Sequence, residues 1–154
     1  ANSMADSDPE AHFPWVAGAL AGRGLAYLHV MALTQRGVER VVVEGAATLV
    51  ARMRRAFGGP FVLNGGFTPG SAEQAVRDGS ADLIAFGQPF IANPDLVERI
   101  AEGVALAVPD RSTYYGGGAA GYVDYPDRHG VVPTPDLDGS PAGGALAALA
   151  GGAA

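Results

Sequence analysis

The stretch that decides the fold runs from Phe61 to Leu96 and holds two strand-to-helix units in succession. The first reads Phe61-Val62-Leu63-Asn64-Gly65-Gly66-Phe67-Thr68-Pro69, and the second reads Asp82-Leu83-Ile84-Ala85-Phe86-Gly87-Gln88-Pro89-Phe90. In each unit a short apolar run, which predicts a strand, ends in a loop that contains glycine. Strands that alternate with helices in this way indicate an α/β fold with a parallel sheet.

The glycine-bearing loops predict a site for a phosphate group. Bare backbone at the carboxyl ends of two adjacent parallel strands offers free N–H groups, and helix N-termini nearby add partial positive charge. In closed βα barrels the last two βα loops often build such a site. The candidates are Gly65, Gly66 and Gly87. An alternative stays open here, because tight strand-to-helix turns in any α/β protein also need glycine.

The segments before this stretch extend the same pattern. Asp8-Pro9-Glu10 is typical of a helix start and predicts a helix that ends near Gly22, with Pro14 either kinking it or marking its beginning. The apolar run Leu25–Val30 predicts a buried parallel strand. Within it, His29 is expected to be a hydrogen-bonded core histidine rather than a metal ligand.

Residues 31–44 favour no single structure, because Val41–Val43 is consistent with a small strand or with an apolar lead into a helix. From Gly45 to Phe57, apolar residues recur at helical spacing and predict an amphipathic helix, which the glycines at 58 and 59 end. Its apolar stripe consists of Ala46, Leu49, Val50, Met53 and Phe57. The arginines at 52, 54 and 55 are expected on its solvated face.

Two shorter helices are predicted after the strand Phe61–Leu63. Ser71 is expected to cap the first, which turns the apolar side chains at 72, 75 and 76 inward. A strand over residues 81–86 follows. The helix after it is expected to begin at Asn93-Pro94-Asp95, with the side chains at 96, 97 and 100 on one face. Residues 104–128, which include several aromatic residues and a glycine run, are expected to form an ordered loop.

Composition excludes several classes of function. The formal charge of -6 and the pI of about 4.8 leave no basic surface for nucleic acid. Absence of cysteine rules out disulfides, thiolate metal sites and cysteine nucleophiles, and it fits a cytoplasmic location. No apolar run approaches the ~18 residues of a membrane span. The start, Ala1-Asn2-Ser3-Met4-Ala5-Asp6, lacks signal-peptide features. The three histidines suggest no metal site.

Length and element spacing favour a barrel that is incomplete in this chain. A closed eight-stranded βα barrel needs about 200–250 residues, and this chain of 154 residues would hold roughly half of one. After residue 128 the composition changes to glycine, alanine and proline. Residues 129–154 are therefore predicted to be a disordered low-complexity tail.

Five segments, in order and with matching spacing, resemble the C-terminal half of the Old Yellow Enzyme family. The family consists of FMN-dependent ene-reductases built on a (β/α)8 TIM barrel. The resemblance covers about residues 5–126, so residues 1–128 are expected to be the C-terminal half of an FMN-binding barrel, with about three to four parallel strands. The segments are Asp6-Ser7-Asp8-Pro9-Glu10, Gly24-Leu25-Ala26-Tyr27-Leu28-His29-Val30, Asn64-Gly65-Gly66-Phe67-Thr68, residues 86–96 from Phe86-Gly87-Gln88 to Asn93-Pro94-Asp95-Leu96, and residues 115–126 from Tyr115-Gly116-Gly117-Gly118 to Asp124-Tyr125-Pro126.

The resemblance implies which residues hold the cofactor. Asn64, Gly65 and Gly66 would follow the seventh barrel strand, and Gly87 would follow the eighth, with the glycines offering N–H groups to the FMN phosphate. Gln88 stands where the family commonly has an arginine that pairs with this phosphate. A glutamine still donates hydrogen bonds but carries no charge, so the resemblance implies a weaker hold on the phosphate.

The resemblance also implies a role for two aromatic residues. Tyr114 and Tyr115 fall where family aromatics pack on the flavin edge and border the substrate pocket, and Tyr114 replaces the more usual phenylalanine.

The resemblance further implies what this chain lacks. The family's carbonyl-gripping His/Asn pair, its proton-donating tyrosine and an arginine near the flavin ring would precede residue 1. No catalytic residue is therefore assigned, and the isolated chain is expected to be inactive.

The activity implied for the full-length protein is the reduction of an activated alkene, such as an enone, by FMN that NADH or NADPH has reduced. The partners would be this small alkene and the missing N-terminal half of the barrel. Two alternatives remain open. One is a non-catalytic half barrel with weak or no FMN binding. The other is a different phosphate-binding βα-barrel enzyme, although the absence of lysine removes Schiff-base chemistry.

Overall fold

The computed structural model describes residues 6–36, 39–42, 45–115 and 118–133, and between residues 33 and 44 it describes the backbone alone. The chain forms two compact units, Ala1–Gln88 and Pro89–Ala154. Among the helices in the described ranges, none combines the length and the apolar character needed to cross a lipid bilayer.

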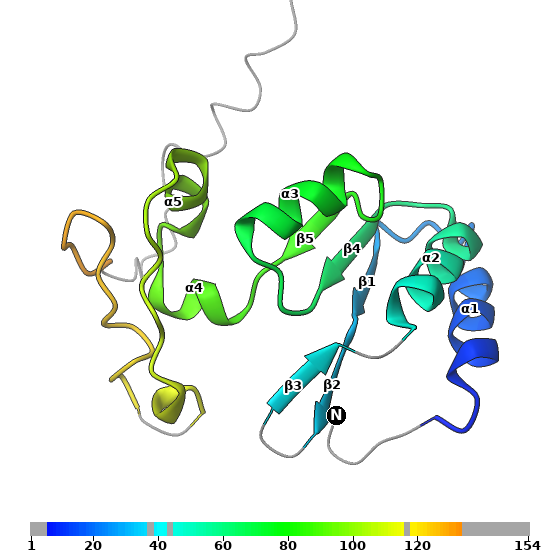
Figure 1. Ribbon diagram of the computed structural model, residues 1–154, viewed down its shortest axis with the longest axis horizontal. Helices are drawn as coiled ribbons and strands as arrows, with labels where there is room; N and C mark the ends of the chain where they lie inside the picture. Colours follow the sequence, from blue (N-terminus) through cyan, green and yellow to red (C-terminus); the bar gives the residue numbers. More distant parts are fainter. Residues whose placement is uncertain (1–5, 37–38, 43–44, 116–117, 134–154) are drawn as a thin grey trace, which may run out of the picture. The chain divides into compact units, whose positions relative to one another are not determined.

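A three-stranded parallel sheet organises the first unit (Figure 1). Its order is β1 (Leu28–Met31), β4 (Phe61–Asn64) and β5 (Leu83–Ala85), so that β4 is the central strand. All three residues at positions 61–63 are buried, as expected for a strand covered on both edges. The α/β class and the parallel sheet predicted from the sequence are confirmed.

The outer strands are shorter than the apolar runs that predicted them. β1 begins at Leu28, where its N–H donates to Pro60 O at 3.0 Å, and it continues one residue past the predicted end to Met31. β5 is confined to Leu83–Ala85 within the predicted 81–86. Pairing in a ladder requires a partner, so the four residues of β4 limit the length of both neighbours.

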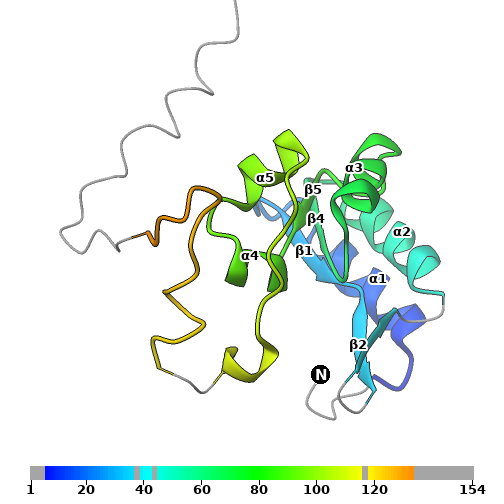
Figure 2. The same ribbon diagram turned by 60° about the vertical axis from the view of Figure 1, so that its left-hand side comes forward.

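An antiparallel pair resolves the ambiguity of residues 31–44. β2 (Leu33–Arg36) pairs with β3 (Glu39–Val42), with Leu33 opposite Val42 and Arg36 opposite Glu39. Ala32 alone separates β2 from β1, and Figure 2 shows the chain passing from one strand into the other. The small-strand interpretation was therefore correct for residues 41 and 42, while residue 43 lies outside the described residues.

The first helix, α1 (Pro9–Leu20), begins where the sequence predicts. The side chain of Asp8 accepts a hydrogen bond from Ala11 N at 3.1 Å, which caps the helix. The helix continues through Pro14, although proline offers no N–H to the preceding turn. Ala17 is fully buried and lies on the face of this helix that packs against the core.

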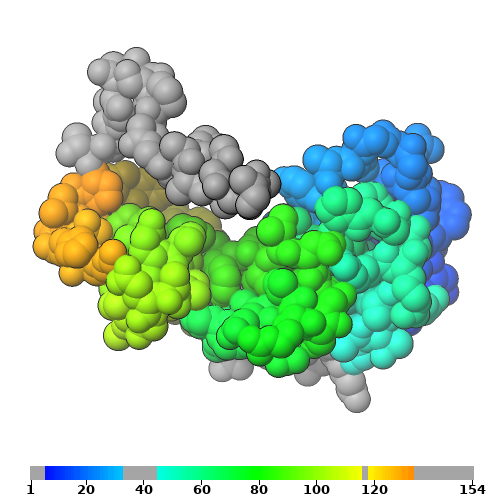
Figure 3. Space-filling model, turned by 90° about the horizontal axis from the view of Figure 1, so that it is seen from above, coloured from blue at the N-terminus to red at the C-terminus, as the bar shows by residue number. Residues whose placement is uncertain are grey.

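The second helix, α2 (Ala46–Phe57), packs against α1 and closes the core. It ends at Gly58, whose φ of 69° is the left-handed conformation that glycine adopts most readily. In the space-filling view the atoms of α2, in turquoise, meet those of the green segment that carries α3 (Figure 3). The buried core of this unit consists of Ala17, Val50, Phe57, Phe61, Leu63 and Ala81.

A bidentate ion pair ties α2 to the sheet. Arg54 Nη1 and Nη2 donate to the two carboxylate oxygens of Asp82 at 2.7 and 2.8 Å. Asp82 Oδ2 also accepts from Phe61 N at 2.7 Å. The hydrogen bonds from Arg54 are the main cause that lowers the pKa of Asp82 to about 2, and the hydrogen bond from Phe61 N is the second. Arg54, whose side chain is 26% exposed, departs from the predicted solvated face. Arg52 and Arg55 agree with it, since Arg52 forms an exposed pair with Glu10 at 2.6 Å and Arg55 is exposed.

The third helix, α3 (Pro69–Arg77), has its N-cap three residues before the predicted cap at Ser71. Thr68 is the N-cap, and Ser71 completes a capping box: Ser71 N donates to Thr68 Oγ1, and Thr68 N donates to Ser71 Oγ. Ala72 and Ala75 face inward as expected, but Val76 is 46% exposed. A hydroxyl residue at either position satisfies a capping motif, so the sequence alone did not distinguish them.

The second unit holds α5 (Leu96–Glu102) and the 3-10 turn η1 (Arg111–Thr113), while α4 (Gln88–Ala92) spans the boundary between the units. α5 begins after Asp95, so the prediction of Asn93 as the cap was wrong. Leu96 is buried and Ile100 half-buried, but Val97 is 64% exposed. Apart from these helices and the turn, residues 104–133 are irregular wherever they are described, in agreement with the loop predicted over 104–128.

The sheet of the first unit has one face covered by the core and an opposite face that is bare on its two outer strands, although Val62 of the central strand is buried there. Alternation along a strand sends neighbouring side chains to opposite faces. Leu28, Val30 and Ile84 pack against the buried core. On the opposite face, His29 is exposed, Met31 is 53% exposed and Leu83 is 58% exposed. The expectation of a core histidine at position 29 was therefore wrong for the chain as described.

We predict that Asp82→Asn flattens the acid dependence of folding. Because the pKa of Asp82 is lowered from 3.8 to about 2, its carboxylate stabilises the folded state above about pH 4, and this contribution is lost as the pH falls toward 2. Urea unfolding midpoints measured between pH 5 and pH 2 would show a shallower decline in the variant. Glu73→Gln, which removes a carboxylate 66% exposed on α3, is the control, and equal flattening by both changes would contradict the prediction.

Candidate cofactor site

The two glycine loops lie side by side at the carboxyl edge of the sheet. Asn64, the last residue of β4, is in register with Ala85, the last residue of β5. Gly65 and Gly66 follow the first strand directly, and Gly87 follows the second after one intervening residue. Parallel pairing of β4 with β5 therefore brings together the loops that the sequence places about twenty residues apart.

Backbone conformation explains two of the three glycines. Gly65 has a φ of 141° and Gly66 a φ of 71°, and L-residues with side chains rarely adopt such values. At Gly87 the backbone lies outside this region, and an added Cβ would meet no described atom within 4 Å. The tight-turn explanation thus accounts for the first loop, but the local fold does not require a glycine at position 87.

The N–H groups of these loops are available to a ligand. Within the described part of the chain, the backbone N–H groups of Gly65, Gly66 and Gly87 donate to no protein acceptor. Unpaired N–H groups on adjacent loops are a donor set that suits a phosphate. Gln88, half-buried at the start of α4, adds an amide of the same unit. All of these donors are neutral.

Other polar groups near the first loop are already engaged. The Thr68 and Ser71 hydroxyls satisfy each other and the first turn of α3. Asn64 Nδ2 donates to Ala85 O at 2.7 Å, and Asn64 O accepts from Ala32 N at 2.9 Å. The resemblance implies that Asn64 binds the cofactor. In the structure its amide nitrogen instead forms a hydrogen bond between the ends of β4 and β5.

The two aromatic candidates belong to the second unit. Tyr114 and Tyr115 follow η1, and their rings pack edge to face with centroids 6.1 Å apart and an interplanar angle of 85°. Tyr114 is half-buried, whereas Tyr115 is 88% exposed. The structure therefore brings together positions 64, 65, 66, 87 and 88 in the first unit, and positions 114 and 115 in the second.

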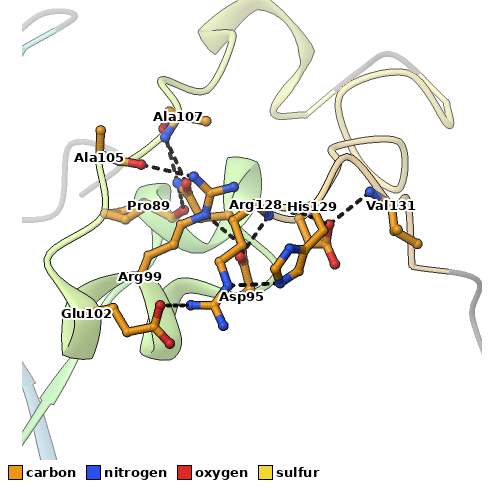
Figure 4. A network of polar contacts seen from close by, with 11 residues as sticks. Pro89, Asp95, Arg99, Glu102, Ala105, Ala107, Arg128, His129 and Val131 are labelled. Carbon is orange, nitrogen blue, oxygen red and sulfur yellow. Dashed lines mark hydrogen bonds and ion pairs between the residues drawn. The ribbon is translucent and has the colours of Figure 1, made fainter.

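A polar network anchors the segment that leads to these tyrosines (Figure 4). Asn93 is fully buried. Its Nδ2 donates to Pro89 O at 2.8 Å and to Ala107 O at 3.0 Å, and its Oδ1 accepts from Ala107 N at 2.8 Å. Sequence reasoning interpreted this residue as a helix cap. The polar residue before proline was the available signal, but its partner lies fourteen positions later and cannot be read from local spacing.

Asp95 is the second anchor of the same network. It accepts from Arg99 Nε at 2.7 Å and from Arg128 N at 2.9 Å, and Arg99 Nη1 donates to Ala105 O at 2.9 Å. Burial raises the pKa of Asp95, but the hydrogen bonds from Arg99 and Arg128 outweigh it and leave that pKa below its ordinary value. Arg128 also pairs with Glu102, so residues on both sides of the tyrosines are tied to α5.

Comparison with known proteins defines the class of this chain. The model of the NADH:flavin oxidoreductase / NADH oxidase family matches residues 13–107, and the chain belongs to that family. The matched range contains both glycine loops and ends before the tyrosine pair.

Individual relatives support this family assignment. The chain is similar to putative 12-oxophytodienoate reductase 10 of Oryza sativa subsp. japonica, with 38% identity over 128 residues, covering 79% of the chain and 39% of that protein. A probable flavin mononucleotide-dependent alkene reductase of Leishmania infantum is 37% identical over 125 residues, covering 81% and 32%. Among solved structures, the old yellow enzyme from Trypanosoma cruzi superposes with a TM-score of 0.70 and 37% identity, covering 81% and 32%.

These comparisons confirm the resemblance to the Old Yellow Enzyme family and the predicted partial (β/α)8 barrel. The chain spans about a third of the length of the relatives it matches. Its three parallel strands correspond to part of the barrel.

We predict that Asn93→Ala destabilises the second unit by about 1–3 kcal/mol, because it removes the three hydrogen bonds that this fully buried amide makes to the backbone of Pro89 and Ala107. The local signature would be faster hydrogen exchange at the Ala107 N–H. Glu98→Ala, on the exposed side of α5, is the matched control and should leave that exchange rate unchanged. Unaltered protection of Ala107 in Asn93→Ala would refute the anchoring role.

Proposed function

We propose that this chain supplies the FMN-phosphate-binding part of an NAD(P)H-dependent flavin oxidoreductase that reduces activated alkenes. One observation carries the proposal: at the carboxyl ends of β4 and β5, the N–H groups of Gly65, Gly66 and Gly87 lie on adjacent loops and donate to no protein acceptor among the described residues. Membership of a flavin oxidoreductase family supports flavin as the ligand. A relative named as an alkene reductase that depends on flavin mononucleotide supports both the cofactor and the substrate class.

The donor set suits the phosphate better than any other part of FMN. A phosphate offers three acceptor oxygens to the N–H groups of two adjacent loops. Gln88 is neutral where the family commonly has an arginine. The four proposed phosphate donors of the first unit, at positions 65, 66, 87 and 88, are therefore all uncharged. We expect the binding to be correspondingly weak and only mildly dependent on salt, because few charges are paired.

FMN, when bound, supplies the two-electron chemistry that connects a nicotinamide to an alkene. The residues of this chain contribute position. The glycines hold the phosphate end, and Gln88 donates a further hydrogen bond from its amide. Tyr114 and Tyr115, whose rings pack edge to face, are proposed to border the flavin edge and the substrate.

We also propose that the remaining strands of a barrel cover the bare face of the sheet. In the described residues, the outer edges of β1 and β5 pair with no other strand. The exposed apolar side chains of Met31 and Leu83 lie on this face. Unpaired edges and exposed apolar side chains favour association with further strands. A polypeptide that supplies the N-terminal half of the barrel fits both features.

The test is a titration of the purified chain with FMN, followed by flavin fluorescence and by absorbance near ~450 nm. We expect Gly66→Ala to weaken FMN binding about tenfold or more, since a side chain strains this left-handed position and displaces the loop. In the same titration, Gln88→Arg is expected to tighten binding through a charged hydrogen bond.

Gly79→Ala is the matched control for this titration. Gly79 has a φ of 76°, lies in the same unit at the end of α3 and has open space around it. The substitution therefore imposes similar backbone strain away from the loops and should leave the FMN affinity unchanged. A wild-type chain that binds no FMN would overturn the proposal, as would equal effects of the two alanine variants.

We predict that the isolated chain of 154 residues does not oxidise NADH or NADPH in the presence of an enone. The physical reason is that none of its residues matches the carbonyl-gripping pair or the proton-donating tyrosine of the family. Absorbance at about 340 nm, which reports the reduced nicotinamide, would follow the reaction with FMN present. Turnover above that of free FMN would disprove this part of the proposal.

A further inference from the structure

Asn64 lies at the carboxyl end of the three-stranded sheet, beside both glycine loops. It is the last residue of the central strand, with Met31 of β1 opposite on one side and Ala85 of β5 opposite on the other. It directly precedes Gly65, and Ala85 stands two positions before Gly87. Any group that links Asn64 to Ala85 therefore links the bases of the two glycine loops.

The hydrogen bonds at this junction have a definite direction. Asn64 Nδ2 donates to Ala85 O at 2.7 Å, and Asn64 O accepts from Ala32 N at 2.9 Å. The backbone thus ties β4 to the end of β1, and the side chain ties it to the end of β5. The carbonyl of Ala85 has the amide of Asn64 as its partner at the point where the strand gives way to the loop.

The strand pair β4–β5 is held at its other end by a separate contact. Asp82 N donates to Phe61 O at 2.9 Å, and Phe61 N donates to Asp82 Oδ2 at 2.7 Å. Since β5 has only three residues, few backbone bonds lie between these ends. The side-chain amide of Asn64 therefore adds a hydrogen bond to a short backbone ladder at the loop end of the strand pair.

We propose that Asn64 is a positioning residue: it does not contact the phosphate, and its amide sets the distance between the Gly65–Gly66 loop and the Gly87 loop. This inference rests on the proposed function of the same site. N–H groups from both loops bind one phosphate only when their spacing matches the positions of its oxygens. Loss of the Asn64–Ala85 bond releases that spacing while the donors themselves remain present.

The test compares FMN with riboflavin, which lacks the phosphate, on the full chain. In Asn64→Leu, which keeps the approximate shape of the side chain and removes its donor, we expect FMN affinity to fall about tenfold. Riboflavin affinity should stay unchanged, so the ratio of the two affinities falls. Gln74→Leu removes another amide from the first unit, on the exposed side of α3, and should leave the ratio as it is.

A second measurement on the unaltered chain separates positioning from direct contact and needs no variant to fold. NMR detects a scalar coupling across the hydrogen bond from Asn64 Nδ2 to the Ala85 carbonyl, in a chain of 15.6 kDa. The coupling should persist when FMN is added. Its disappearance on addition of FMN would show that the amide turns to the ligand and would overturn the proposal.

The remaining outcomes also decide the question. Equal losses of FMN and riboflavin affinity in Asn64→Leu would assign Asn64 to general stability, and no loss of either would remove it from the site. Both results contradict the inference while leaving the proposed function intact. A wild-type chain that binds neither flavin would overturn the proposed function and this inference together.

Discussion

The core of the first unit and the candidate site at its edge depend on the parallel pairing of β4 with a strand on each side. Backbone groups inside a protein must find partners, and in this sheet β1 and β5 supply them. The pairing buries Phe61 and Leu63 against α1 and α2. It also places the ends of β4 and β5 next to each other, so the same ladder that satisfies the backbone creates the candidate site.

Each end of the β4–β5 pair is secured by one polar side chain. At the amino end, Asp82 accepts from Phe61 N and pairs with Arg54, which fastens α2 to the sheet as well. At the carboxyl end, the amide of Asn64 reaches the carbonyl of Ala85. The charged pair therefore stabilises the amino end of the strand pair, next to α2, whereas a neutral amide lies at the carboxyl end beside the glycine loops. A neutral group there leaves the loops free of a competing carboxylate, which would repel a phosphate.

Local signals in the sequence predicted local structure well. The cap at Asp8, the helical stripe that ends at Phe57 and the central strand all agree with the structure. The errors occurred where two residues offered similar capping chemistry, as with Thr68 and Ser71, or where a side chain has a distant partner, as with Asn93 and Ala107. Similarly, the exposure of His29 depends on which face of the sheet other strands cover, and an apolar run does not reveal that.

The sequence by itself determined the order of the three parallel strands and of the helices α1, α2, α3 and α5, the glycines at 65, 66 and 87, and the uncharged residue at position 88. These features can be predicted from the spacing of glycines and from apolar runs, because turns and strands each favour particular residue types at neighbouring positions. Only the tertiary structure decided that Asn64 bonds to Ala85 and that Arg54 holds Asp82. Such contacts depend on strand register and helix packing, which join residues more than twenty positions apart and therefore leave no periodic trace along the chain.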